Sequence, residues 1–453
     1  MKKIEYTLKD ICEKIWELEQ KYDLFSIEEK GIPIWEIIRS DLVSEVILET
    51  GLYSQSNTLK NSFFDKIKYL PKAIYWSIFK NPFFSFKKVD NLIFEFSRKK
   101  FINNENVDIY TFYLVRKFIE NKVNFEKFDF QNKFNHLCKN DNKIKYLDFL
   151  TVLTSIGGKI LRFKISKKNL NIFKEVEKNI SVFFNIKLNF SYKLNFIFTK
   201  NIIISWLFNI LIKQKKPKKI YLVLEQTEYL KPLIKEAKKL GVETIELQHG
   251  IISNYHMAYS FPKLERNTLK CFSDKIYLWD DIFKKMCTNF PISNDKLIVK
   301  GFDYLEQQKI EFKRVEKKEN QIIIISQGSF TKKISEIIKS ILIESKEYTI
   351  IYKLHPLEYY KWRDFDLLVD ISKYDNVKII DNNEIPLYHF LAESKYLIGA
   401  YSTVVFEALH FDCKILLLDL PSVNEHMGPL IKDGTVKFIK KNEKIMDYII
   451  GEN

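Results

Sequence analysis

Short apolar runs alternate with amphipathic stretches through the second half of the chain. The run IYLVLE at 220–225 is followed by YLKPLIKEAKKLG at 229–241 and then by VETIELQ at 242–248. The middle stretch repeats its apolar residues at helical spacing and ends in Gly, whereas the flanking runs are short and continuous. Strand, helix and strand with short connections predict a parallel βαβ unit. The same order continues through a strand KIYLW, a helix from about Asp280 and a strand KLIVKGF.

A second cycle of the same kind follows the polar stretch at 306–320. Its predicted strands are QIIIISQG, YTIIYKLHP, NVKIID, YLIGAYS and KILLLDLP, and its predicted helices are TKKISEIIKSILIES, IPLYHFLAES and TVVFEALHF. Because 453 residues exceed one compact core, two domains are expected. We therefore predict an α/β protein with two Rossmann-like domains, at 91–310 and 311–453, preceded by a helical extension at 1–90.

Two segments of the first half raise the question of a membrane. Between Phe63 and Lys88 aromatic residues alternate with lysines, which is typical of a helix lying on an anionic membrane and equally of rings that pack on a neighbouring domain. The run IIISWLFNILI at 202–212 is too short to span a bilayer comfortably, so a buried helix is predicted there.

Composition and charge narrow the class of partner. The chain has 73 Lys plus Arg against 58 Asp plus Glu, a net charge of +15, which favours anionic partners unless it reflects a compositional bias of the source. No nucleic-acid motif occurs, so nucleic acid is not expected. Five scattered cysteines without a CxxC pair predict neither a disulfide framework nor a zinc site, and the amphipathic N-terminus predicts a cytoplasmic protein.

Several motifs with known mechanisms do not occur in the sequence. The chain has no GxxxxGK[ST], GxGxxG, HExxH or GxSxG pattern, which disfavours P-loop NTPases, ordinary NAD enzymes, zincins and standard α/β-hydrolases. We expect no metal and no cofactor.

Polar residues directly follow the strands of the second domain. In an open parallel sheet ligands bind beyond the carboxyl ends of the strands, so these residues are the candidates for a nucleotide and its phosphate. The set comprises Gln327, Gly328, Ser329, His355, Pro356, Ser402, Thr403 and Glu407. Ser402 and Thr403 open a helix whose free amides favour phosphate, although Ser402 also fits an ordinary N-cap. Glu407 either accepts hydrogen bonds from ribose hydroxyls or serves as a first-turn carboxylate that compensates the helix dipole.

The first domain ends two strands in a comparable way. Glu225 follows one strand, and Gln248, His249 and Gly250 follow the next. His249 is the first candidate for a general base because imidazole titrates near neutrality, and Glu225 is the rival. We expect the acceptor side of the cleft to be lined by Gln248, Gly250, His256, Tyr259 and, from a separate polar loop, Arg98.

The order of ELQHG, KLHP and AYSTVVFEAL resembles bacterial GT-B glycosyltransferases of surface-polysaccharide assembly. The nearest likeness is to the sialyl-, polysialyl- and Kdo-transferases that use CMP-activated sugars. The resemblance implies two Rossmann-like domains facing across a cleft, with His355 and Pro356 holding CMP and Ser402 and Thr403 holding its phosphate. GIPIWEIIR at 31–39 also resembles the opening of many capsule proteins. The acidic-acidic-glycine motif of the sialyltransferases is matched only by EEKG at 28–31, which carries an intervening lysine.

The expected function is transfer of a nonulosonic acid or Kdo from a CMP-sugar to a capsule or lipopolysaccharide-type glycan. The partners would be the nucleotide-sugar donor, a glycan or lipid-linked glycan acceptor and, peripherally, the inner face of the cytoplasmic membrane. Two alternatives stay open. KLHP with a later YS[ST] also resembles teichoic acid polymerases, which implies a CDP-glycerol or CDP-ribitol phosphate transferase, and the fold also suits a non-catalytic partner in polysaccharide assembly.

Overall fold

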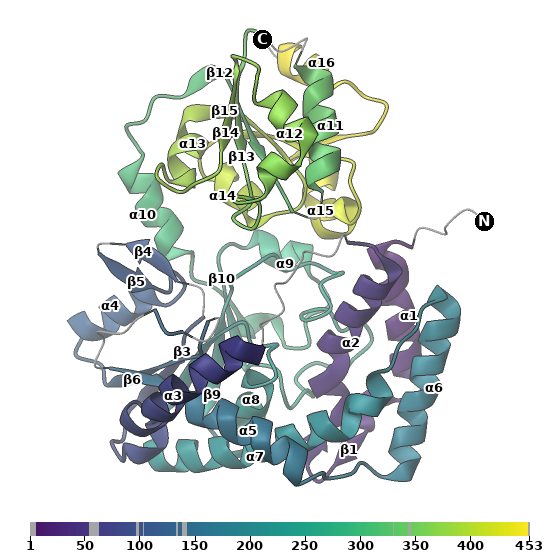
Figure 1. Cartoon of the computed structure of the whole chain (residues 1–453), viewed down its shortest axis with the longest axis vertical. Coiled ribbons are helices and arrows are strands. Elements are labelled where there is room, and N and C mark those ends of the chain that lie inside the picture. The colour runs from purple at the N-terminus through teal and green to yellow at the C-terminus, as the bar shows by residue number, and fades with distance from the viewer. Residues whose placement is uncertain are drawn as a thin grey trace.

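Two lobes are stacked along the long axis of the molecule, each built around a twisted sheet (Figure 1). The computed structural model describes residues 6–53, 63–96, 99–102, 104–132, 135–137, 143–328, 330–342 and 346–451. The lower lobe holds the N-terminal sheet and the upper lobe the C-terminal sheet, and α10 (Asp303–Glu311) lies where the chain passes between them.

The N-terminal sheet has seven parallel strands among the described residues. They are β3 (Asn91–Phe94), β6 (Phe125–Asp129), β7 (Ile144–Tyr146), β8 (Lys219–Val223), β9 (Glu243–Leu247), β10 (Lys275–Leu278) and β11 (Leu297–Val299). Their spatial order is β11-β10-β9-β8-β3-β6-β7, so the chain winds outward in one direction from β3 and then returns to build the other side from β8. This is the doubly wound Rossmann order, with its switch point between β3 and β8.

The C-terminal sheet repeats the same winding. The described strands are β12 (Lys318–Ile325), β13 (Thr349–Lys353), β14 (Val377–Ile380), β15 (Ser394–Gly399), β16 (Lys414–Leu418) and β17 (Lys437–Ile439). All pair in parallel in the order β14-β13-β12-β15-β16-β17, and the switch point lies between β12 and β15. The strands predicted from the apolar runs are therefore confirmed, and the fold class is confirmed as α/β with two Rossmann-like domains.

Helices cover both faces of the sheets, as parallel strands require because both of their faces must be buried. In the upper lobe α13 (Leu387–Glu393) lies on one side, whereas α11 (Thr331–Ile341), α12 (Asp366–Ile371) and α16 (Ile445–Ile450) lie on the other (Figure 1). Other helices of the two lobes are α4 (Phe112–Glu120), α8 (Leu230–Lys239), α9 (Ile282–Met286), α14 (Thr403–Leu409) and α15 (Val423–Lys432).

The lower lobe also contains three helices on its outside: α3 (Phe63–Phe79), α5 (Asp148–Ile160) and α7 (Phe190–Lys215). Within the described part of the chain, α7 is the one helix long and apolar enough to cross a membrane, but 56% of its most apolar stretch is buried inside the protein. Leu207, Phe208 and Leu211 are fully enclosed in the core of the N-terminal domain. The helix predicted at 202–212 is thus present and largely buried.

The N-terminal helices α1 (Leu8–Lys21) and α2 (Ile34–Thr50) form a core with α6 (Lys167–Phe184) rather than with either sheet. A two-residue ribbon, β1 (Glu28–Glu29) and β2 (Ile32–Pro33), joins them, and a second ribbon is made by β4 (Lys100–Ile102) and β5 (Glu105–Val107).

Arg39 on α2 connects this helical layer to the loop that follows β9. Its guanidinium is 2% exposed, contacts Glu19 and donates to the carbonyl oxygens of Met257 and Ser260, the latter at 2.9 Å. The guanidinium also lies over the Phe261 ring, 4.1 Å from its centroid. The GIPIWEIIR segment therefore supports the loop that carries His256.

Candidate functional site

A cavity of about 440 Å³ lies between the two domains. Its lower wall comes from the loop after β9 and from α2, and its upper wall comes from the loop after β15 and from α15. The residues that line it include Ser40, Ser44, Tyr53, Gly250, His256, Tyr401, Thr403 and His426. The carboxyl ends of both sheets thus meet at one site, where open α/β sheets bind their ligands.

The two domains are joined at this cavity by a direct polar contact. Ser253 Oγ in the loop after β9 lies 2.9 Å from His426 Nδ1 on α15. The Tyr401 ring packs against the His426 ring at a tilt of 39°, with 4.5 Å between centroids, and the Tyr53 hydroxyl donates to Ser422 Oγ at 3.1 Å. His426, Ser253 and Tyr53 were not among the residues predicted from the sequence.

Three histidines near the cavity are held neutral at physiological pH. Enclosure by the protein lowers the pKa of His249 and of His256 to about 4 and that of His426 to about 3. A charge on His256 would repel charges on both His249 and His426, which depresses their pKa values further. Neutral imidazoles offer one donor and one acceptor each, so the cluster can take a proton or hold an anion.

His249 lies behind the cavity wall rather than on it. Its side chain is 18% exposed, its ring faces those of Phe96 and Tyr110, and its Nδ1 is 3.8 Å from Glu246 Oε1. The Nδ1 atoms of both His249 and His256 are buried and have no hydrogen-bond partner among the described residues. Because such atoms are costly to leave unpaired, they are the atoms that a ligand would satisfy.

Glu225 does not reach the cleft. Its side chain is fully buried, Oε1 accepts from Gln226 Nε2 at 2.9 Å, and Oε2 accepts from the Ser273 amide at 3.0 Å. Burial raises the pKa of Glu225, and burial together with Glu225 raises the pKa of neighbouring Glu246 well above its usual range. A carboxyl group with both oxygens engaged and no exposure is a structural group, so its prediction as a base is not supported by its placement.

Two residues expected to line the acceptor side are also structural. Gln248 is 1% exposed, its Oε1 accepts from the Trp279 amide at 2.9 Å and its Nε2 donates to the Gly250 carbonyl at 2.9 Å. Tyr259 is buried and donates to Glu246 Oε1 at 2.7 Å. Of the residues predicted for this side, Gly250 and His256 line the cavity.

In the upper domain a buried glutamate ties two of the predicted loops together. Glu358 accepts from Ser326 Oγ at 2.9 Å, from the Thr331 hydroxyl and from the His355 amide at 2.7 Å. It thereby fixes the loop after β12, which carries Gln327 and Gly328, against the loop after β13, which carries His355 and Pro356. Glu358 was not predicted from the sequence, although it lies two residues after the KLHP motif.

Gln327, in the first of these loops, does not line the cavity but lies next to Tyr401, which does. Gln327 Oε1 is buried without a hydrogen-bond partner among the described residues, and the side chain lies beside the Tyr401 hydroxyl. His355 and Pro356 are not among the residues that line the cavity, and Gly328 is exposed. His355 Nδ1 accepts from the Leu357 amide at 3.2 Å, which turns the ring back on its own loop.

The structure places Ser402, Thr403 and Glu407 in three different environments. Ser402 Oγ accepts from the Val404 amide at 3.3 Å and so caps α14, whereas Thr403 lines the interdomain cavity. Glu407 is 7% exposed and lines a separate cavity of about 150 Å³ on the other side of α14. Its carboxylate faces Tyr388 and Lys100. Glu407 is therefore not placed to reach a ligand in the larger cavity.

No protein-family model matches the sequence, and no curated protein matches it. Solved structures with a similar course of the chain include UDP-GlcNAc 2-epimerase from Methanocaldococcus jannaschii, with 12% identity over 80% of this chain and 91% of that chain and a TM-score of 0.47. UDP-GlcNAc 2-epimerase from Neisseria meningitidis, bound to UDP-GlcNAc, has 14% identity over 80% and 89% and a TM-score of 0.46.

MurG from Acinetobacter baumannii has 11% identity over 80% of this chain and 89% of that chain, with a TM-score of 0.42. At TM-scores below 0.5 and identities this low, these likenesses decide neither the substrate nor the chemistry of this chain. The assignment of the site depends on the residues themselves.

Arg98 and Ser329 lie outside the described residues. Among the described residues, a buried ion network ties together the carboxyl ends of β3, β6 and β7. Lys99 Nζ lies 2.7 Å from Glu95 and 3.1 Å from Asp129, and the His136 ring bridges Asp129 at 2.7 Å and Asp148 at 2.8 Å. This network fixes the ends of the strands on the side of the switch point where Arg98 follows β3.

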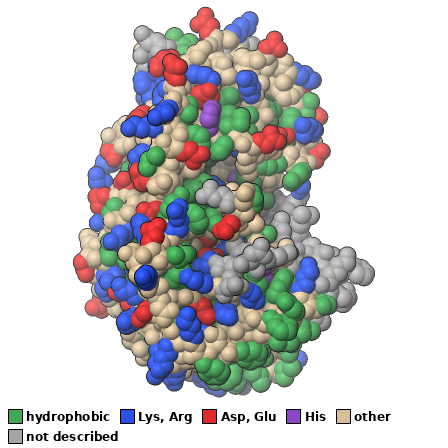
Figure 2. Space-filling view, turned by 90° about the vertical axis from the view of Figure 1, so that its left-hand side faces the viewer, with side chains coloured by type: hydrophobic (Ala, Val, Ile, Leu, Met, Phe, Trp, Pro, Cys, Tyr) green, Lys and Arg blue, Asp and Glu red, His purple; other side chains and the backbone are tan. Residues whose placement is uncertain are grey.

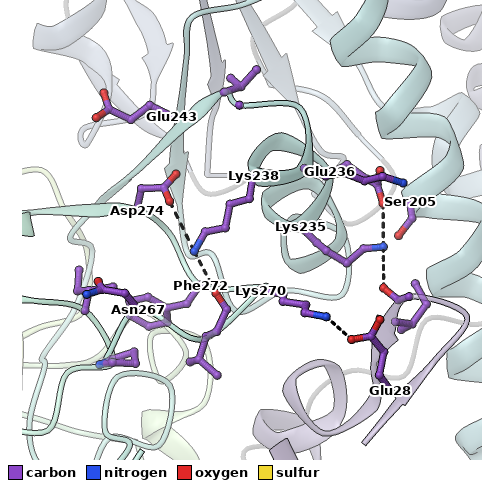
Figure 3. A pocket seen from close by; sticks show the side chains of 18 of the residues that line it. Glu28, Ser205, Lys235, Glu236, Lys238, Glu243, Asn267, Lys270, Phe272 and Asp274 are labelled. Carbon is purple, nitrogen blue, oxygen red and sulfur yellow. Dashed lines mark hydrogen bonds and ion pairs between the residues drawn. The ribbon is translucent and has the colours of Figure 1, made fainter. Parts of the chain in front are cut away.

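The EEKG segment lies far from the cleft, at the opposite end of the lower sheet. It lines a larger cavity of about 1160 Å³ with the C-terminal turn of α8 (Figure 3). Most of the charges there are paired: Lys270 with Glu28, Lys235 with Glu236 at 2.7 Å, and Lys238 with Asp274 at 3.5 Å. Glu28 and Glu29 thus cannot supply a base to the interdomain site.

Among the residues that the structure describes, no group of three or more His, Cys, Asp or Glu side chains is arranged to hold a metal ion. The interdomain cavity instead offers the imidazoles of His256 and His426 and the hydroxyls of Tyr401 and Thr403. Such groups donate hydrogen bonds to phosphate oxygens and accept a proton from a hydroxyl, which are the tasks of a transferase that acts on an activated sugar.

Proposed function

We propose that the protein is a glycosyltransferase that moves an acidic nine- or eight-carbon sugar from a CMP-sugar to a hydroxyl of a capsule or lipopolysaccharide-type glycan. The observation that carries the proposal is the interdomain cavity, which His256 lines from the lower domain and His426 from the upper, with the His256 Nδ1 atom buried and without a hydrogen-bond partner among the described residues. The resemblance of the KLHP and AYST segments to CMP-sugar transferases supports the choice of donor.

The proposed reaction needs one proton acceptor and several phosphate donors. The acceptor hydroxyl oxygen forms a bond to the anomeric carbon, the bond from that carbon to the phosphate oxygen breaks, and the hydroxyl proton passes to an imidazole. His256 is the first candidate for this proton because it lines the cavity, and His249 is the second because it lies behind the wall. A pKa of about 4 makes a weak base, and an anionic donor bound beside the ring would raise that pKa.

Charge on the departing CMP phosphate would be stabilised from the upper domain. Thr403 and Tyr401 present hydroxyl groups to the cavity, and the neutral His426 ring lies against Tyr401. Hydrogen-bond donors fixed in place before the reaction are worth more than mobile water because they need no reorganisation. In this proposal no metal takes part, and the donor is a co-substrate rather than a cofactor.

The experiment that tests this function is release of CMP from a panel of donors. The purified protein is incubated with a CMP-nonulosonate, CMP-Kdo, CDP-glycerol and CDP-ribitol, each with and without EDTA. Release of CMP from a CMP-sugar that persists in EDTA supports the proposal. Release of CMP only from a CDP-alditol assigns the polyol-phosphate transferase, and release from none of them favours a non-catalytic partner in polysaccharide assembly.

We propose that the enzyme acts at the inner face of the cytoplasmic membrane, where it would encounter lipid-linked acceptors. Peripheral association fits a chain with net charge +15. Which surface would make that contact is a separate question from the chemistry of the cleft.

A further inference from the structure

Three helices of the lower lobe present large apolar side chains to solvent. Helices α3, α5 and α7 pack side by side and cross the lower front of the molecule (Figure 1). Exposed apolar residues on them and directly after α3 and α5 include Ile74, Tyr75, Ile78, Phe79, Phe84, Phe86, Ile156, Ile160, Leu161, Trp206 and Ile210. We refer to these residues as the α3–α5–α7 face. Some of these side chains are mostly exposed: Phe86 by 81%, Ile160 by 69% and Trp206 by 60%.

The face is continuous because α5 and α7 approach closely. A Cβ atom at Gly157 would lie 2.7 Å from Ile203 Cδ1, and one at Gly158 would lie 3.0 Å from both Phe196 and Lys200. The two glycines therefore allow the backbones of α5 and α7 to lie close together. Figure 2 shows hydrophobic side chains gathered at the foot of the molecule, at the height where Figure 1 places α5 and α7. Clusters of this kind mark interaction surfaces in soluble proteins, in which exposed apolar residues are otherwise scattered.

The charge on the three segments has one sign. Residues 69–89, 155–168 and 190–218 contain 15 Lys and Arg residues and no Asp or Glu, in a chain with 58 acidic residues. Some of these lysines are paired, as Lys200 is with Glu228 at 2.6 Å. Others are exposed and have no ion-pair partner within the part of the chain that the structure describes, namely Lys72, Lys87, Lys88, Lys159 and Lys213.

Apolar rings beside unpaired lysines match an anionic bilayer, which offers hydrocarbon below and negative headgroups at the surface. A second copy of the chain fits poorly, because two such faces would bring like charges together. The face would lie on the membrane and not cross it, since the inner side of α7 belongs to the core of the domain.

We propose that the α3–α5–α7 face is a docking surface for an anionic lipid bilayer. The proposal extends the membrane contact considered for Phe63–Lys88 to two helices far along the chain. It depends on this surface alone and is measured without nucleotide, so its failure is distinguishable from failure of the proposed transferase activity.

The first experiment is co-sedimentation of the full chain with vesicles of phosphatidylcholine alone and with added phosphatidylglycerol. Binding is expected only with the anionic lipid and should weaken as salt is raised from 0.1 M to about 0.5 M, because screening shortens the range of the attraction. The double variant Ile160→Ser/Trp206→Ser should lower the bound fraction about tenfold, since it removes two exposed side chains from the apolar layer. The matched control is Ile310→Ser/Ile385→Ser, which removes exposed isoleucines elsewhere and should bind like the parent.

A second variant leaves the helices untouched. Lys87→Glu/Lys88→Glu changes two exposed lysines in an irregular segment and should also lower binding about tenfold, whereas Lys332→Glu/Lys333→Glu on α11 should not. Equal binding to neutral and anionic vesicles, or unchanged binding of both face variants, would overturn the proposal. So would light scattering that shows a dimer dissociated by Ile160→Ser/Trp206→Ser, because the face would then be occupied by a second copy.

Discussion

Ser253 Oγ and His426 Nδ1 lie 2.9 Å apart, and this contact joins the two Rossmann-like domains at the cavity between them. Because a neutral imidazole has one donor and one acceptor nitrogen, His426 Nε2 takes the role opposite to that of Nδ1 in this contact. Replacing Ser253 by Ala should leave His426 Nδ1 unpaired and loosen the closed arrangement. We expect a fall in nucleotide affinity of about three- to tenfold with little change in fold, measured by calorimetry and far-UV circular dichroism. The exposed Ser155→Ala is the control.

Acid should destabilise the protein through its histidines. The pKa values of His249, His256 and His426 are depressed from 6.5 to about 4, 4 and 3, so the unfolded chain binds more protons than the folded chain between pH 6.5 and 4. Stability is therefore complete above pH 6.5 and is lost as the pH falls toward 4, by about 1.4 kcal/mol for each pKa unit of each group.

Urea unfolding at pH 7.5 and pH 5 measures this loss. The variant His426→Gln should lose less stability between the two pH values than the parent, because one of the depressed groups is gone. An identical loss in His426→Gln and in the parent would show that His426 does not contribute.

Glu225, predicted from the sequence as an alternative base, and His256, which lines the cavity, make opposite predictions. Glu225 is buried with both oxygens engaged, so Glu225→Gln should keep CMP release within about threefold of the parent. His256 lines the cavity, so His256→Asn should lower CMP release by about 100-fold or more while nucleotide binding persists. A large loss of turnover in Glu225→Gln with normal stability would return the role to the carboxylate.

Arg39 should be essential for the stability of the site. Its guanidinium is buried with Glu19 and holds the carbonyl oxygens of Met257 and Ser260. Arg39→Met leaves the Glu19 carboxylate buried without its partner, which should cost about 3–5 kcal/mol in urea unfolding. The exposed pair of Arg363 with Asp381 provides the control, since Arg363→Met should cost less than about 1 kcal/mol.

The sequence predicts the central strands well because they are short, apolar and bounded by turns. It does not reveal β6 and β7, whose sequences FEKFD and IKY carry charged residues. Those charges are buried in pairs made with distant parts of the chain, such as Glu126 with Lys215 at 2.6 Å and Lys127 with Glu95 at 3.3 Å. A local pattern of polarity cannot report partners that only the fold brings together.

The same limit applies to the site. Glu225, Gln248 and Tyr259 sit at or after strand ends, where ligands bind, but their partners Ser273, Trp279 and Glu246 turn them into structural residues. His426 was missed although it opens the helix after the last predicted strand, KILLLDLP, which is the same position that identified the other candidates. The position of His426 after that strand can be read from the sequence. Its contact with Ser253 depends on how the two domains are arranged in the fold.

A thermal-shift series with CMP, CDP, UMP, UDP and GDP, with and without magnesium, tests most directly whether the interdomain cavity binds a CMP-sugar donor. It is made on the parent, on His426→Gln and on the exposed control Lys332→Ala. A ligand that binds only the folded state raises the melting temperature. We predict a rise in melting temperature that is selective for CMP, independent of magnesium, kept in Lys332→Ala and lost in His426→Gln. A preference for UDP or GDP, or a CMP response that His426→Gln retains in full, would contradict it.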